Sequence, residues 1–84
     1  MQNTDGSWTD ESLLKLAKNS NDVATLSKKI NPAVVITKLM VLWLQKNHNS
    51  KQYALILKKA LAWLKKKITE EGIDEGQLNA IQPN

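Results

Sequence analysis

The stretch that decides the fold runs from residue 32 to residue 47 and reads PAVVITKLMVLWLQKN. It is the most apolar segment of the chain, and between residues 33 and 44 only Thr37 and Lys38 are polar. Asn31 and Pro32 predict a helix start here, because Asn accepts hydrogen bonds from free backbone N–H groups and Pro suits the first helical position. A helix that is apolar nearly all round is expected to be buried by neighbours on several sides.

Two other interpretations of this stretch are a membrane span and a buried strand. A span needs roughly 20 apolar residues, whereas this segment has Lys38 near its middle. A buried strand is disfavoured by the length of the segment and by the Asn-Pro start. The sequence therefore predicts a central buried helix over residues 32–47.

The composition is that of one small domain. The chain has 84 residues, so it can bury about 60–65% of its unfolded surface. It contains no Cys, which excludes disulfides and thiolate metal sites. The polar N-terminus lacks the features of a signal peptide, and we therefore expect a cytoplasmic location, or a nuclear one in a eukaryote.

The charge is segregated along the chain. All twelve cationic residues are Lys, and the net charge is +4. Between Val23 and Thr69 there are ten Lys and no acidic residue, so the middle of the chain is strongly basic. The eight carboxylates lie outside that segment, at Asp5, Asp10, Glu11, Asp22, Glu70, Glu71, Asp74 and Glu75.

Three further helices are predicted around the central one. Thr9 is placed to cap a helix over residues 10–18 and Asn21 a helix over residues 22–30. A longer helix starts near Ser50, where Asn49 and Gln52 approximate a capping box. It ends near residue 71, with Gly72 as a left-handed cap.

The predicted fold is an all-α, small four-helix bundle in which the third and fourth helices form an antiparallel hairpin. A short fifth helix can follow Asp74 and would carry Leu78 and Ile81. Residues 1–8 are predicted to be a disordered or loosely held tail, residues 9–72 the single helical domain, and residues 73–84 an acidic C-terminal tail.

The fourth helix carries the most informative surface. Its spacing predicts an inward stripe of Tyr53, Leu57, Leu61, Leu64 and Ile68, with Ile56 and Trp63 at the edge of that stripe. One interpretation is a solvated basic face with Lys stems lying over apolar neighbours. The other is a docking patch anchored by Trp63, since Trp is enriched at interface hot spots. The predicted partner-binding residues are Ile56, Lys59, Trp63, Lys66 and Lys67. An alternative basic face consists of Lys51, Lys58, Lys59, Lys65 and Lys66.

No pattern in the chain predicts catalysis, a cofactor or a metal. The single histidine, His48, has no Cys or carboxylate near it in sequence, so it does not indicate a metal site or a catalytic dyad. The carboxylates fall in helix ends and tails, which are solvated positions. Gly6, Gly72 and Gly76 form no phosphate-binding loop. We therefore expect a protein that is not an enzyme.

Three classes of function remain open. The first is a protein-interaction module, bound to another protein or to itself as a homodimer, because the apolar surface exceeds what four short helices can cover. The second is nucleic-acid binding through phosphate contacts of the Lys-rich face. Base-specific readout is less expected because there is no Arg. The third is a membrane-surface or bacteriocin-immunity role, suggested by the cationic amphipathic pattern of residues 55–68.

Residues 32–68 resemble two unrelated families about equally. One is the C-terminal helical domain of a class of WD-repeat proteins of ribosome biogenesis, and the other is the N-terminal helical domain of TFIIS-type transcription elongation factors. Neither resemblance rests on a specific motif, and the Gly-Lys step typical of the second family is missing. No residue role is carried over, but both families are interaction modules, which slightly favours the first class.

Overall fold

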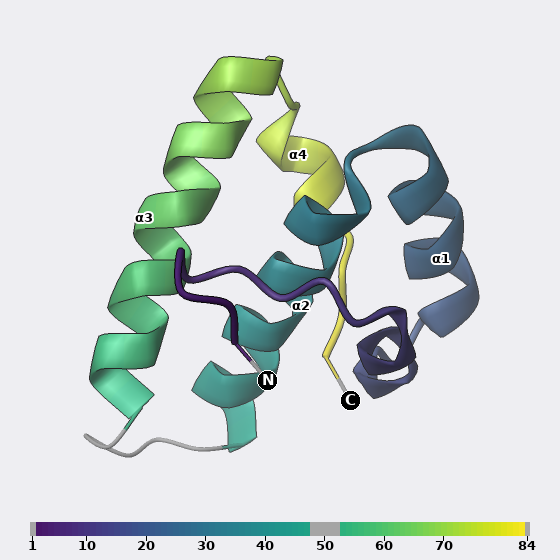
Figure 1. Ribbon diagram of the computed structural model, residues 1–84. Coiled ribbons are helices and arrows are strands. Elements are labelled where there is room, and N and C mark those ends of the chain that lie inside the picture. The colour runs from purple at the N-terminus through teal and green to yellow at the C-terminus, as the bar shows by residue number, and fades with distance from the viewer. Residues whose placement is uncertain (1, 48–52, 84) are drawn as a thin grey trace.

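The protein is an all-α domain built around one buried helix (Figure 1). The computed structural model describes residues 2–47 and 53–83. Within them the chain forms a 3-10 helix η1 and four α-helices, and no strand beyond an isolated bridge between Ala17 and Pro83. Their bounds are η1 Glu11–Leu16, α1 Ser20–Lys29, α2 Pro32–Asn47, α3 Ala54–Glu71 and α4 Glu75–Leu78.

The helix α2 occupies the centre, as predicted, and contacts η1, α1 and α3. Its predicted bounds are confirmed, and so is the cap, because the Ala33 N–H donates to Asn31 Oδ1 at 3.0 Å. Its inward residues are fully or almost fully buried: Val34, Val35, Ile36, Leu39, Val41 and Leu44. Even Thr37 is buried, and its hydroxyl oxygen accepts a hydrogen bond from the Trp8 backbone N–H at 2.9 Å.

The helices α2 and α3 lie side by side and run in opposite directions (Figure 1), which agrees with the predicted hairpin. The connection between them, including His48, Ser50 and Lys51, lies outside the described residues. At the far end of α3 the predicted cap is confirmed. Gly72 has a φ of 61°, and the Ile73 N–H donates to the Ile68 carbonyl at 3.0 Å, which is the hydrogen bond of a Schellman motif.

The N-terminal segment differs from the expected loose tail, because residues 2–8 pack across α3 and α2 (Figure 1). Gln2 Nε2 donates to the Ile56 carbonyl at 3.1 Å, and Trp8 belongs to the core. Gly6 adopts a φ of 99° and lies so close to α3 that a Cβ there would be 2.6 Å from the Lys59 carbonyl oxygen. Only a glycine satisfies both conditions without strain.

The C-terminal segment, beyond the predicted boundary at residue 72, also packs against the helical core. The predicted short helix is present as α4, and Asp74 caps it by accepting from the Gly76 N–H at 2.9 Å. Leu78 and Ile81 are buried in the same core as α2. Beyond them, the Lys18 N–H donates to the Gln82 carbonyl at 2.7 Å.

The first two helices depart from their predicted limits. Residues 11–16 form a 3-10 helix, and its cap is Asp10, whose carboxylate accepts from the Ser12 N–H at 3.0 Å, so the prediction of Thr9 as cap is wrong. The next helix begins at Ser20. Asn19, just before it, bonds the C-terminal segment: it donates to the Ala80 carbonyl and accepts from the Gln82 N–H. The result is two long helices with shorter pieces around them.

Candidate functional site

The orientation of α3 about its own axis determines which of its residues can meet a partner. Its buried residues are Ala60, Trp63 and Leu64, whereas Leu61 is 44% exposed. The prediction that Leu61 faces inward is therefore wrong. At 100° per residue, the buried face is turned by about 60° from the predicted stripe.

Trp63 explains this rotation. Burying an indole removes more apolar area from water than burying a leucine side chain, and Trp63 is 9% exposed in the structure. Ala60, one turn earlier on the same face, is fully buried as well. The N-terminal segment then covers this edge of the helix, as the contacts of Gln2 and Gly6 with α3 show.

The surroundings of Trp63 are polar on one side. Lys67 Nζ lies 6.0 Å from the centroid of the indole ring, at the limit of a cation–π contact. Asp5 lies on the N-terminal segment, and hydrogen bonds from the Ser7 hydroxyl and backbone N–H lower the pKa of its carboxyl group. Trp63 makes a smaller contribution to the same lowering of the pKa.

The structure separates the predicted partner-binding residues into two groups. Trp63 is buried and Ile56 is half-buried beneath the N-terminal segment, so the structure does not place the predicted anchor Trp63 at the surface. Lys59 and Lys66 are exposed. Lys67 is partly buried, with Nζ 3.6 Å from a carboxylate oxygen of Glu70.

The alternative basic face is exposed where the structure describes it. Lys58, Lys59, Lys65 and Lys66 are all exposed, and Lys51 lies outside the described residues. Among the described residues the salt bridges are those of Lys66 and Lys67 with Glu70. Such exposed pairs contribute little to stability, so this side of α3 keeps most of its positive charge available to a partner.

A mixed apolar and basic surface lies on the solvent side of α3. Leu55 is 65% exposed and Leu61 is 44% exposed, and both are large hydrophobic side chains. We call this surface the α3 outer face. Its members are the exposed residues Ala54, Leu55, Lys58, Leu61, Ala62 and Lys65.

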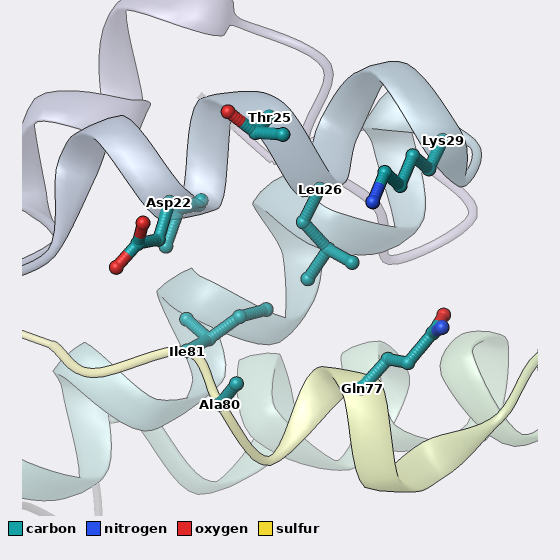
Figure 2. Close-up of a pocket in the computed structure, with 8 residues that line it drawn as sticks. Asp22, Thr25, Leu26, Lys29, Gln77, Ala80 and Ile81 are labelled. Carbon is teal, nitrogen blue, oxygen red and sulfur yellow. The ribbon is translucent and has the colours of Figure 1, made fainter.

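A second feature is a groove between α1 and the C-terminal segment, which we call the α1–α4 groove (Figure 2). The groove has an apolar part and a polar part, and the apolar part has a volume of about 260 Å³. Leu26 of α1 and Ile81 of the C-terminal segment point toward one another across it. Asp22 lies at one end, and Lys29 and Gln77 lie at the other.

A polar hollow of about 410 Å³ continues the groove, since Lys29 and Gln77 line both. Its other lining residues include Glu71 and Asp74. Glu71 accepts a hydrogen bond from Asn31 Nδ2 at 3.2 Å, and Asp74 caps α4. The groove and its extension together present three carboxylates, those of Asp22, Glu71 and Asp74, against the single ammonium of Lys29.

Sequence reasoning did not find this groove, and no local pattern signals it. Residues 22–29 and 77–81 are far apart in sequence, and the groove exists because the C-terminal segment returns to α1. The apolar pair Leu78 and Ile81 indicates that this segment packs on the core, but not that it forms a groove with α1.

Two further observations concern metal ions and membranes. No group of three or more His, Cys, Asp or Glu able to hold a metal ion occurs in residues 2–47 and 53–83. Over the same residues, none of the helices combines the length and hydropathy needed to cross a bilayer.

No known protein family, curated protein or solved structure matches this chain. Neither of the two family resemblances of residues 32–68 is therefore supported by a match. The surface features of the described residues that suit a partner are the α3 outer face and the α1–α4 groove.

Proposed function

We propose that this chain is a non-enzymatic protein-interaction module whose contact surface is the α3 outer face. The observation that carries the proposal is the exposure of Leu55 and Leu61 on a helix that is otherwise well packed. Exposed apolar surface that is rimmed by charged residues is typical of partner-binding sites. This is the class of function predicted from the sequence, but the proposed apolar contacts are Leu55 and Leu61 in place of Trp63.

The partner's chemistry follows from the charges around these leucines. Lys58 and Lys65 belong to the α3 outer face, Lys59 and Lys66 border it, and no acidic residue occurs between residues 54 and 69. A partner that buries Leu55 and Leu61 must therefore bring carboxylates close to these ammonium groups. We expect a protein surface with an apolar hollow and acidic residues around it.

A symmetric dimer through this face is disfavoured by the same charges. In a two-fold contact the same patch meets itself, which would bring Lys58 and Lys65 of one copy against the lysines of the other. Like charges brought together at an interface cost several kcal/mol. A homodimer built in this way would therefore lose much of what burial of the leucines contributes.

The test is a titration of the labelled protein with an acidic amphipathic peptide made of Leu and Glu, followed by NMR. We expect shifts concentrated on the α3 outer face, and roughly tenfold weaker binding for Leu55→Ser with Leu61→Ser. The matched control is Lys15→Glu with Lys18→Glu, two exposed lysines away from α3, which should bind nearly as wild type. Shifts elsewhere, or equal binding by the leucine variant, would refute the proposal.

Nucleic-acid binding is the second candidate, because Lys58, Lys59, Lys65 and Lys66 are exposed along one helix. Phosphate contacts of this kind weaken steeply with salt and do not depend on the leucines. Titration with a generic DNA duplex separates the two functions. Binding that survives Leu55→Ser with Leu61→Ser, and is lost in Lys58→Glu with Lys65→Glu, would favour nucleic acid.

The membrane alternative has less support. A cationic amphipathic peptide over residues 55–68 would place Ile56 and Trp63 in the lipid. Here Trp63 is buried and Ile56 is packed against the core. Insertion of Ile56 and Trp63 into a membrane would require α3 to separate from the rest of the domain.

A further inference from the structure

A surface with the properties expected of the partner, an apolar hollow with acidic residues near it, is present on the same chain. The α1–α4 groove has an apolar floor in which Leu26 and Ile81 face one another (Figure 2), and carboxylates lie around it. We infer that the chain associates head to tail, with the α3 outer face of one copy seated in the α1–α4 groove of the next. This inference rests on the proposed function and names the partner as a second copy.

The charges of the two surfaces are complementary. The groove and its extension contribute Asp22, Glu71 and Asp74, and the adverse charge is that of Lys29. Among the described residues, the salt bridges with carboxylates all use Glu70, so these three are not occupied by ion pairs there. The facing helix would bring Lys58 and Lys65 to them.

The apolar parts also correspond. Leu55 and Leu61 lie six residues apart, so they are separated by about 9 Å along the axis and by about 120° around it, at the two edges of the α3 outer face. The apolar part of the groove follows α1 from Asp22 to Lys29, which is about 10 Å by the same measure. A leucine entering beside Leu26 and Ile81 would leave water and gain apolar contacts.

The two surfaces lie on different sides of the domain and can be used together. In Figure 1 the helices α3 and α1 lie on opposite sides of α2, and α2 contacts both. The residues of the α3 outer face and those lining the groove do not overlap. A contact between two different patches is heterologous. A pair of copies joined in this way still has one free α3 outer face and one free groove, so further copies can add to form a ring or a helical filament.

The first experiment measures the solution mass of the full chain by light scattering, over a series of concentrations up to about 1 mM. The mass of one chain is 9.4 kDa. We expect the average mass to rise above this value with concentration. The increase should shrink when salt is raised from about 50 mM to about 500 mM, since screening weakens exposed charge pairs.

Two variants block one patch each. Leu55→Ser with Leu61→Ser removes the apolar side chains of the α3 outer face, and Ala80→Trp fills the groove at an exposed lining residue. Each variant alone should stay at 9.4 kDa. The matched control is Asn79→Trp, which adds the same side chain at an exposed neighbour that does not line the groove, and it should assemble as wild type.

Mixing the two blocked variants is the decisive step, because the mixture retains one intact interface. The Ala80→Trp chain keeps its α3 outer face, and the Leu55→Ser with Leu61→Ser chain keeps its groove. An equimolar mixture should therefore form a 1:1 complex of about 19 kDa, twice 9.4 kDa, and grow no further. Circular dichroism of each variant shows whether it retains the helical fold.

A wild-type mass of 9.4 kDa at all concentrations would overturn the inference, and so would assembly of Ala80→Trp. In either case, binding of the acidic peptide to the α3 outer face would still support the proposed function. Failure of both the self-association and the peptide binding would overturn the proposed function as well.

Discussion

The helices α2 and α3 are built from similar residues, Leu, Ile, Ala, Trp and Lys, but their sequences determine very different amounts of structure. α2 is apolar nearly all round, and neighbours on several sides bury it. Almost any rotation of such a helix about its axis buries apolar side chains. α3 has more apolar width than one contact can cover and must leave some of it in water, so its rotation decides which residues form the core and which form a surface.

The difference between α2 and α3 shows that an amphipathic pattern does not by itself determine which side of a helix is buried. Two apolar stripes compete on α3, one through Leu57 and Leu61 and the other through Ile56 and Trp63. The pattern of four and three favours the first stripe. The structure buries Trp63 and exposes Leu61, because the larger side chain gains more from burial and because the N-terminal segment is available to cover it.

The largest expected effect comes from Trp63→Ala. Removing a buried indole should lower the free energy of unfolding by about 3–5 kcal/mol, which urea denaturation measures. The matched control on the same helix is Leu61→Ala, which should change the free energy of unfolding by less than about 1 kcal/mol because Leu61 is 44% exposed. Equal costs for the two variants would contradict the rotation of α3 that buries Trp63 and exposes Leu61.

A similar cost is expected at an inward position of α2. Leu39→Ala should lower the free energy of unfolding by about 2–5 kcal/mol, because Leu39 is fully buried and its removal leaves a cavity. Thermal unfolding followed by circular dichroism gives the difference from wild type. A cost below about 1 kcal/mol would contradict the central position of α2.

The contact of the N-terminal segment with α3 predicts an intermediate effect for Gly6→Ala. The added Cβ would clash with the Lys59 carbonyl, and the positive φ of Gly6 adds strain, so we expect a loss of about 1–3 kcal/mol. Gly72→Ala is the matched control, since Gly72 also has a positive φ but has no neighbour within 4 Å of the added Cβ. A smaller loss at Gly6 than at Gly72 in urea denaturation would show that the segment does not pack on α3.

The start of α2 predicts a smaller effect. Asn31→Ala removes the acceptor for the Ala33 N–H and should cost about 1 kcal/mol. Asn31→Ser retains a capping oxygen and should recover most of this difference in the same denaturation experiment. If both variants matched wild type, the predicted role of Asn31 as the cap of α2 would be excluded.

The smallest expected effect concerns pH. The Ser7 hydrogen bonds hold the pKa of Asp5 below its ordinary value in the folded chain. The contribution of Asp5 to stability is therefore full above the unfolded pKa of about 3.9 and is lost as the pH falls through the folded pKa. The Asp5→Asn variant should be slightly less stable than wild type near neutral pH, and the gap should close in acid. A gap independent of pH would show that the charge of Asp5 is not responsible.

The sequence by itself determined the all-α class, the limits of α2, and the caps at Asn31 and Gly72. These features depend on neighbouring residues, since a cap bonds backbone groups one to five residues away and the α2 pattern is apolar at every turn. Sequence reasoning also identified α3 as the helix with a surplus of apolar and basic surface.

Only the tertiary structure decided which side of α3 faces water and what the two chain ends do. The contacts that fix these features join residues distant in sequence: Gly6 with Lys59, Trp8 with Thr37, and Asn19 with Ala80. No local preference encodes such contacts, because each depends on where α2 places the other elements. The groove between α1 and the C-terminal segment exists for the same reason, since its two walls meet only when the chain returns to cover the core.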